Sequence, residues 1–164
     1  LTGLYNRRYL DETLEREMAR AEREGYPLAL VMLDIDHFKN LNDSYGHRAG
    51  DEVLRQLGEF LRHHARAGDL PCRYGGEEFL LVLPQLDMAH ALERAETWRR
   101  EFAELVVNFE GDQLQATVSA GVACYPDHGQ TPDRLVEAAD SALYRAKAEG
   151  RNRVMGAPDP AHAD

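Results

Sequence analysis

Several features are scarce in this chain of 164 residues. It has only two cysteines, Cys72 and Cys124, which excludes a small fold held together by many disulfides. They allow one disulfide, but we expect two free thiols, as in a reducing compartment. No apolar run is long enough to cross a membrane, and no signal-peptide pattern opens the sequence. We therefore expect a cytoplasmic domain, which leaves room for a membrane tether elsewhere in a full-length protein.

Positive charge is also in short supply. The chain has 19 lysines and arginines against 29 acidic residues, for a formal net charge of -10 at pH 7. A general nucleic-acid binder needs many cations to neutralise phosphates, so we expect no nucleic-acid partner. A few local cations and metal ions are still enough to hold a single anionic nucleotide.

The length and the hydrophobic content of 43% suit one compact domain with a sizeable core. We expect this domain to cover residues 1–155 and residues 156–164 to form a flexible tail. The first helical pattern begins within a few residues of Leu1. We therefore expect an excised domain whose upstream regulatory modules are not in this sequence.

Hydrophobic spacing predicts alternating helices and strands. Helical periodicity appears at residues 10–21, 53–61, 88–105 and 135–146, with stops at Gly25, Gly68 and Gly150. Short apolar or alternating runs predict strands at 28–33, 71–74, 79–83, 114–122 and 153–155, and residues 34–50 are a polar stretch. The expected fold is α+β, with helices covering a mostly antiparallel sheet.

Asp34 and Asp36 stand where the buried strand over 28–33 ends. The two-residue period of a strand puts both carboxylates on one side. An unpaired carboxylate in such a place is costly. Two interpretations stay open, namely that the group caps a turn or that it binds a cation.

A second feature is the run Gly75, Gly76, Glu77 and Glu78 between two predicted strands. The glycines supply the backbone freedom of a tight hairpin and let another molecule's phosphates approach closely. Acidic residues at a hairpin tip usually just face water, and they repel phosphate unless a metal lies between. Magnesium commonly binds one or two carboxylates plus substrate phosphates. Asp34 and Glu77 meet if their strands are neighbours in the sheet.

Other polar residues allow a structural or a functional interpretation. Asn42 and Asp51 have the donor and acceptor types that match a guanine edge, but such residues also serve in turns and helix caps. Lys39 can neutralise phosphate. Lys147 and Arg151 suit a helix C-terminus, or they bind phosphate if that end lies beside the hairpin.

The sequence resembles the GGDEF domains, the diguanylate cyclases. The segment Gly-Gly-Glu-Glu-Phe at 75–79 resembles their defining motif. Other segments agree in order and spacing: LTGLYNRR at 1–8, DIDHFK at 34–39, ND at 42–43, GH at 46–47, GD at 50–51, RY at 73–74, SAGV at 119–122, ADSALYRAK at 139–147 and GRN at 150–152. The third motif position is Glu77 rather than Asp, and active members carry either.

The resemblance implies a fold similar to the palm of adenylyl cyclases and some polymerases, with a ferredoxin-like core. It also implies two Mg²⁺ per active site, for which Mn²⁺ can substitute, and the following residue roles. Metal ligands are Asp34, the Ile35 carbonyl and Glu77; catalytic residues are Glu77, Glu78 and Lys39; substrate-binding residues are Phe38, Lys39, Asn42, His47, Asp51, Leu54, Lys147 and Arg151.

The implied reaction joins two GTP molecules into cyclic di-GMP, a second messenger, and two pyrophosphates by two-metal phosphoryl transfer. Each domain holds one GTP, so two copies must face each other as a homodimer. The main alternative is a catalytically silent module that senses GTP or cyclic di-GMP. Another is a different palm-fold enzyme, such as a mononucleotide cyclase or a polymerase. The intact Asp34, Lys39, Glu77 and Glu78 argue against a silent module. The guanine pair and the acidic surface argue against a polymerase.

Arg66 and Asp69 lie just before the hairpin at the spacing of the family's product-inhibition site. The resemblance implies that cyclic di-GMP binds there as an inhibitor. The family's supporting arginine on the following helix falls at Thr97. Arg94 or Arg100 are the candidates to replace it.

Overall fold

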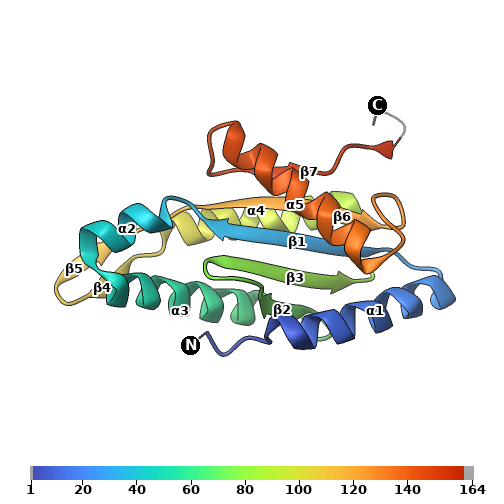
Figure 1. The fold of residues 1–164 in the computed structure, drawn as a ribbon, viewed down its shortest axis with the longest axis horizontal. Helices are drawn as coiled ribbons and strands as arrows, with labels where there is room; N and C mark the ends of the chain where they lie inside the picture. The colour runs from blue at the N-terminus through green and yellow to red at the C-terminus, as the bar shows by residue number, and fades with distance from the viewer. Residues whose placement is uncertain (1, 161–164) are drawn as a thin grey trace.

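A five-stranded sheet with helices on both faces forms the body of the structure, a computed structural model that describes residues 2–160 (Figure 1). The expected α+β architecture is confirmed. In chain order the elements are α1 (Arg7–Glu24), β1 (Leu28–Ile35), α2 (Phe38–Tyr45), α3 (His47–His64), β2 (Leu70–Arg73), β3 (Glu78–Pro84), α4 (Met88–Glu104), β4 (Val107–Phe109), β5 (Asp112–Leu114), β6 (Val118–Tyr125), α5 (Pro132–Ala148) and β7 (Val154–Gly156).

The main sheet has the strand order β2-β3-β1-β6-β7, with β1 in the centre. Its pairings are antiparallel except for the parallel pair of β6 and β7. All eight residues of β1 are buried, which explains the continuous apolar run in the sequence. At the end of β1, Asp34 lies opposite Glu78 of β3 on one side and Ser119 of β6 on the other.

Two layers of helices cover the two faces of this sheet. Alternate residues of β1 pack in different clusters: Leu28, Leu30 and Met32 contact the apolar faces of α1 and α5, whereas the residues between them face α3 and α4. Figure 1 shows α5 in front of the sheet and α4 behind it. The three layers leave the end of β1 beside the hairpin of β2 and β3, which is where the sequence predicted a site.

Capping residues define the N-terminal ends of α1 and α5. The Asn6 side chain accepts a hydrogen bond from the backbone of Tyr9 and caps α1, while Gly25 closes that helix at a φ of 74°. Thr131 caps α5 in the same way as Asn6 caps α1.

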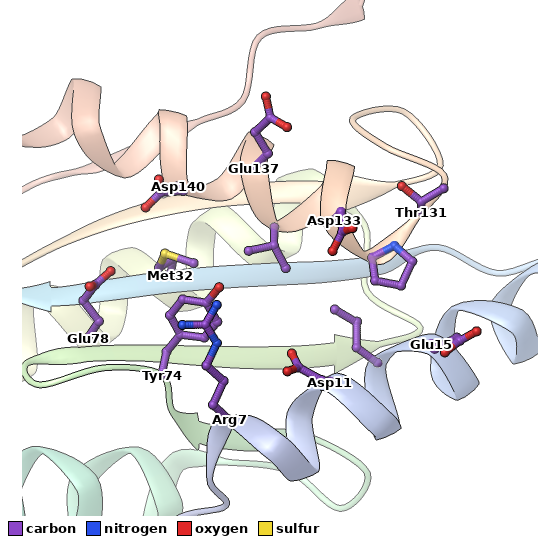
Figure 2. Close-up of a pocket in the computed structure, with 13 residues that line it drawn as sticks. Arg7, Asp11, Glu15, Met32, Tyr74, Glu78, Thr131, Asp133, Glu137 and Asp140 are labelled. Atoms are coloured by element: carbon purple, nitrogen blue, oxygen red, sulfur yellow. The ribbon is translucent and has the colours of Figure 1, made fainter.

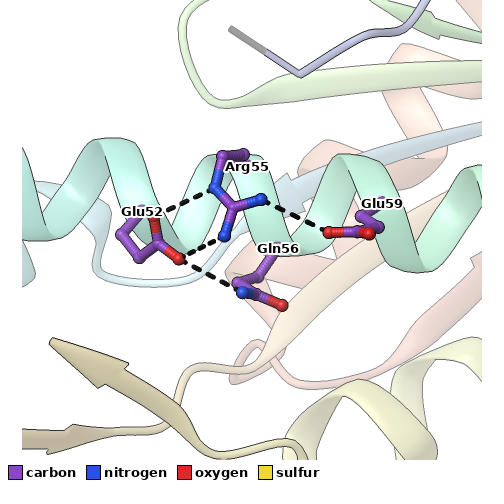
Figure 3. A network of polar contacts seen from close by, with 4 residues as sticks. All are labelled: Glu52, Arg55, Gln56 and Glu59. Atoms are coloured by element: carbon purple, nitrogen blue, oxygen red, sulfur yellow. Dashed lines mark hydrogen bonds and ion pairs between the residues drawn. The ribbon is translucent and has the colours of Figure 1, made fainter.

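The exposed side of α3 carries a network of polar contacts, shown in Figure 3. Arg55 donates to Glu52 at 3.0 and 2.6 Å and to Glu59 at 3.4 Å, and Gln56 donates to Glu52 at 3.1 Å. The hydrogen bonds from Arg55 lower the pKa of Glu52. Exposed pairs of this kind contribute little to stability because water and salt screen them, so the network orders side chains more than it stabilises the fold.

The sequence missed one helix and one strand pair. Residues 34–50 were predicted only as polar, but they contain α2 and the start of α3, because Phe38 and Leu41 give α2 an apolar side that packs on the core. The predicted strand at 114–122 was placed too early. Leu114 belongs to β5, which pairs with β4 in a separate ribbon, and β6 begins only at Val118. The second predicted helix also ends earlier than Gly68, at His64.

The first two residues of the expected flexible tail are packed against the sheet. Residue 156 was predicted to begin a tail, but Gly156 ends β7, and Ala157 is buried and donates a backbone hydrogen bond to Val122 at 2.7 Å. Pairing with β6 therefore fixes the chain as far as Ala157. The domain end at 155 stays a prediction, and residues 161–164 of the expected tail lie outside the described residues.

Both cysteines are buried and free, as expected. Burial raises the pKa of Cys72 to about 12 and that of Cys124 to about 11, so neither is a reactive thiolate at neutral pH. Within residues 2–160, no helix is both long enough and apolar enough to cross a membrane.

Candidate active site

A small cavity of about 240 Å³ opens at the end of β1. Four separate parts of the chain form it: the end of β1, the start of α2, the glycine hairpin and the end of α5. Its lining residues are Asp34, Ile35, Asp36, His37, Phe38, Lys39, Asn40, Glu77, Lys147 and Arg151. The predicted convergence of Asp34 with Glu77 is therefore confirmed, and both predicted phosphate-binding cations of α5 lie in the same place.

Asp34 is the most buried charged group of this cavity, with 3% of its surface exposed. Its Oδ2 accepts a hydrogen bond from Lys147, while its Oδ1 is buried without a protein partner. Desolvation raises the pKa of Asp34, and Lys147 offsets this only in part. A buried carboxylate oxygen without a partner is costly, which marks a position for a cation.

The glycine hairpin is held by its own flanking residues. Arg73 donates to the carbonyl of Gly75 at 3.2 Å and to that of Gly76 at 2.7 Å. The backbone N–H of Ile35 donates to the carbonyl of Glu77 at 3.4 Å, which ties the hairpin to the end of β1. Sequence reasoning missed Arg73, although an arginine two residues before paired glycines is a usable signal for a clamped turn.

The two glutamates of the hairpin line different cavities. Glu77 lines the small cavity, whereas Glu78 lines a larger one of about 840 Å³ between α1 and α5 (Figure 2). In that larger cavity the Arg7 guanidinium lies 4.2 Å from the centre of the Tyr74 ring. Besides Glu78, its lining includes five acidic residues: Asp11, Glu15, Asp133, Glu137 and Asp140.

The pKa values of Glu77 and Glu78 are both raised. Burial is the larger cause for each, and the neighbouring charge of Asp34 adds to it. Three carboxylates thus gather where their charges oppose one another. Such clustering stabilises the fold poorly and is typical of a functional site.

The donor set fits magnesium. Asp34 and Glu77 supply two carboxylates beside the backbone of Ile35 in one cavity, and the unpartnered Asp34 Oδ1 is one available ligand. Within residues 2–160 there is no group of three or more His, Cys, Asp or Glu side chains arranged to hold a metal. Magnesium is usually bound by one or two carboxylates, and its remaining ligands come from carbonyls, water and phosphates.

The predicted guanine residues lie on α2 and α3. Asn42 is in the middle of α2, and its Oδ1 is buried without a protein partner. Gly50 of α3 faces it closely: a Cβ there would overlap Asn42 Oδ1 and lie 3.1 Å from Phe38. His47 and Asp51 are exposed in the first turns of α3, whereas Leu54 is buried.

The capping alternative for Asn42 and Asp51 is not supported. The cap between α2 and α3 is Gly46, which has no side chain and adopts a φ of 93°. Asn42 and Asp51 lie inside their helices, and the buried amide oxygen of Asn42 has no hydrogen-bond partner in the protein. Their positions leave a polar amide and a carboxylate available for a planar polar ligand.

The side chains of Lys147, at the end of α5, and of Arg151, in the turn that follows, both line the cavity. Lys147 pairs with Asp34, and Arg151 lines the same cavity. The geometric condition for a phosphate-binding role is therefore met. Lys39 is exposed in the first turn of α2 and lines the cavity from that helix.

Arg66 and Asp69 meet at the end of α3. The backbone N–H of Arg66 donates to Asp69 Oδ2 at 2.8 Å, and Arg94 Nη2 donates to the same oxygen at 2.9 Å. Arg94 also lies over the Trp98 ring, 5.0 Å from its centre. Arg66 lines two neighbouring cavities, each of about 420 Å³.

Thr97 and the two candidate arginines of α4 differ in their contacts. Thr97 bonds to a carbonyl of its own helix, whereas Arg94, one turn earlier, reaches Asp69. Arg100 is exposed on the same helix. Of the two candidates for the missing arginine, Arg94 is therefore the one that contacts Asp69.

Known proteins resemble this chain in sequence and in structure. The family described as "Diguanylate cyclase, GGDEF domain" matches residues 1–153. The response regulator PleD of Caulobacter vibrioides is 44% identical over 158 residues, which cover 95% of this chain and 35% of PleD. The chain thus spans about a third of that relative's length.

Two solved structures show the same fold. The GGDEF domain of DgcB from Caulobacter crescentus, in complex with c-di-GMP, matches with a TM-score of 0.91 and 37% identity over 96% of this chain and 91% of that one. The active GGEEF domain of a diguanylate cyclase from Vibrio cholerae matches with a TM-score of 0.88 and 35% identity, covering 95% of this chain and 99% of its own.

Proposed function

The chain belongs to the GGDEF family of diguanylate cyclases, and from that premise we propose that this domain joins two GTP molecules into cyclic di-GMP. The observation that carries the proposal is the meeting of Asp34 and Glu77 in one cavity with Lys39, Lys147 and Arg151. Carboxylates for a divalent cation and cations for phosphates are the two requirements of phosphoryl transfer.

The proposed reaction has two equivalent steps. The 3′-hydroxyl of one GTP attacks the α-phosphorus of the other, and pyrophosphate leaves. A second, symmetric attack closes the ring and releases the second pyrophosphate. When bound, two Mg²⁺ ions, or Mn²⁺ in their place, supply Lewis acidity that lowers the pKa of the attacking hydroxyl and offsets charge on the leaving group.

The residues of the chain bind and orient the nucleotide. Asp34, Glu77 and the Ile35 carbonyl would hold the metal. Lys39, Lys147 and Arg151 would orient the phosphates. The exposed Asp51 and the unpartnered Asn42 amide would pair with the guanine edge, beside Phe38, His47 and Leu54.

Glu78 is the candidate for moving the proton. It is adjacent to the metal-facing Glu77 and faces the other cavity. Its raised pKa makes it a better proton acceptor than an ordinary glutamate. We propose that Glu78 assists at the metal site or in deprotonation of the attacking hydroxyl.

The proposal requires a homodimer. One chain carries one set of phosphate-binding residues, and the reaction consumes two GTP molecules. Two copies must therefore face each other, and a two-fold axis makes the two steps equivalent. PleD is about three times as long as the matched region, which leaves room in that relative for a dimerising or regulatory module.

We further propose that Arg66 and Asp69 bind cyclic di-GMP as an inhibitor. Support comes from the buried, fixed carboxylate of Asp69, held by Arg94, beside the exposed Arg66 side chain. An exposed guanidinium next to an anchored carboxylate offers a donor and an acceptor to a phosphate and a guanine base.

The direct test is to incubate the domain with GTP and MgCl₂ and to separate the products by chromatography. We expect cyclic di-GMP, increasing with the square of protein concentration at low concentration because two copies must meet. A linear or mononucleotide cyclic product would overturn the assignment. No product at high protein concentration, together with retained GTP binding, would instead favour a sensing module.

A further inference from the structure

Asp36 is a buried carboxylate that the proposed chemistry leaves without a role. It lies just beyond β1, two residues after Asp34, with 5% of its surface exposed. Its Oδ2 accepts hydrogen bonds from the Thr117 hydroxyl at 2.6 Å and from the backbone N–H of Asn152 at 3.0 Å. Its Oδ1 accepts from the Ser119 hydroxyl at 2.7 Å. Both oxygens are therefore satisfied by neutral donors.

The turn that Asp36 holds has an unusual backbone. Gly150, Arg151 and Asn152 have φ values of 124°, 63° and 49°. Glycine adopts positive φ freely, but side-chain-bearing residues do so rarely, and two in succession must be held by their surroundings.

Three contacts fix the peptide between Arg151 and Asn152. Its N–H donates to Asp36 and, at 3.1 Å, to the Ser119 hydroxyl. Its carbonyl, that of Arg151, accepts from Arg153 Nε at 3.1 Å. A peptide plane held at both ends has one orientation, so the direction in which the Arg151 side chain leaves the backbone is also set.

Helix α4 fixes the turn from the other side. Arg99 donates to the Asn152 side-chain oxygen at 2.8 Å, and Glu96 in turn accepts two hydrogen bonds from Arg99. The turn is thus held between α4 and the end of β1. Asp36 is the one charged acceptor that contacts its backbone among the hydrogen bonds of residues 2–160.

We propose that Asp36 is a positioning residue that holds this turn so that the Arg151 guanidinium meets the triphosphate of GTP beside Asp34 and Glu77. Two carboxylates at the end of β1 would then have separate roles. Asp34 would face the metal, and Asp36 would fix the turn that carries Arg151. This inference rests on the proposed function, because it needs a triphosphate in the cavity.

Variants of Asp36 distinguish the positioning role from two alternatives, a direct effect of its charge on the metal and a general loss of fold stability. If Asp36 acted through its charge on the metal, Asp36→Asn would be as damaging as Asp36→Ala. If it only stabilised the fold, its loss would combine independently with the loss of Arg151. A positioning role requires only an acceptor for Asn152, which an asparagine oxygen provides while its amide donates to Ser119.

The test measures the dissociation constant of guanosine 5′-(α,β-methylene)triphosphate with MgCl₂ by calorimetry. The variants are Asp36→Ala, Asp36→Asn, Arg151→Ala and the double variant Asp36→Ala/Arg151→Ala. A destabilised control, Val107→Ala, removes a buried side chain of β4 outside the cavity lining. Amide hydrogen exchange at Asn152, followed by NMR, reports on the turn without nucleotide.

We expect Asp36→Ala to raise the dissociation constant of the analogue about tenfold, which corresponds to the loss of one charge-assisted hydrogen bond. The dissociation constant of Asp36→Asn should stay within about threefold of that of the starting chain. The double variant should bind like Arg151→Ala alone, and Asn152 exchange should accelerate in Asp36→Ala. If Asp36→Ala does not fold, Thr117→Val, which removes one partner of the carboxylate, should show the same coupling to Arg151 at a smaller size.

Independent effects of Asp36 and Arg151, an asparagine variant as weak as the alanine variant, or unchanged Asn152 exchange would overturn the positioning role. A loss of affinity in Val107→Ala equal to that in Asp36→Ala would do the same. Failure of the unmodified domain to bind the analogue would instead overturn the proposed function and this inference with it.

Discussion

Lys147 donates a hydrogen bond to the buried Asp34 across 113 residues of chain. The pair joins the end of α5 to the end of β1, so two elements that are distant in sequence share one charge interaction. Desolvation still raises the pKa of Asp34 despite this cation. The site is therefore less favourable for folding than an apolar contact would be.

Glu77→Gln should remove turnover with little effect on folding. The side chain is half-buried at a hairpin, so an isosteric amide fits, but a neutral oxygen is a poor magnesium ligand. We expect product formation to fall at least about 100-fold, since even indirect partners of metal ligands matter at that level. Glu22→Gln, an exposed change on α1, is the control. Retained turnover would remove Glu77 from the mechanism.

Glu78→Gln should stabilise the metal-free protein at neutral pH. Burial raises the pKa of Glu78 above its ordinary value of 4.5, so the folded state binds the proton more tightly than the unfolded state. This contribution is present below the ordinary value and is lost as pH rises through the folded pKa. Because the side chain is half-exposed, we expect a gain of ~0.5 kcal/mol at pH 7.

Urea unfolding in the presence of a chelator, at about pH 3 and about pH 7, measures this effect. The two proteins should have the same free energy of unfolding at the lower pH, where Glu78 is protonated in both states. A variant less stable than the starting chain at neutral pH would show that Glu78 is instead a stabilising charge.

Gly50→Ala should damage nucleotide binding more than folding. A Cβ at this position overlaps Asn42 Oδ1, so the amide must move away from its place in α2. Overpacking of this kind costs about 1–3 kcal/mol, and here the flexible amide absorbs part of it. We expect KM for GTP to rise about tenfold with a smaller change in kcat. An unchanged KM would argue against Asn42 as a guanine contact.

Asp51→Asn should change base preference. A carboxylate accepts from the guanine N1–H and N2 amino groups, whereas an amide nitrogen would donate to the carbonyl that xanthine carries at that position. We expect weaker GTP binding and a relative gain for XTP, measured by competition. Asp43→Asn, at an exposed neighbouring site on α2, is the control. Equal losses for both nucleotides would contradict direct base contact.

Arg66→Ala should relieve product inhibition. The exposed guanidinium is the free cation of the pair, because Asp69 is already held by Arg94. We expect the half-inhibitory concentration of cyclic di-GMP to rise about tenfold with unchanged initial rates. Arg100→Ala should leave inhibition unchanged, since that side chain is exposed on α4. Inhibition that persists in Arg66→Ala would refute the site.

Much of the fold was predictable because the strongest signals are local. The apolar run at 28–33 and the capped pattern of α1 depend on near neighbours in sequence. α2 was missed because only Phe38 and Leu41 give its eight residues an apolar side. The ribbon of β4 and β5 was missed because Leu114 alternates with residues of the next strand, and only pairing with Val107 separates them.

Several predicted site residues line the cavity at the end of β1, but the contacts among them could not be predicted from the sequence. Strand adjacency was enough to bring Asp34 to Glu77. The function of Asp36 was hidden, because its partners Thr117 and Asn152 are 81 and 116 residues away. A hydrogen bond over such a separation depends on how β6 and the turn after α5 pack, which no local pattern encodes.

The complete burial of β1 affects how variation among related chains should be interpreted. Both faces of this strand are packed, so drift in residues 28–33 is confined to apolar exchanges of similar volume. Invariance there would reflect steric selection and would say nothing about catalysis. Packing places little constraint on the exposed Lys39 and Asp51, so invariance at these positions would be better evidence of a role in binding or catalysis.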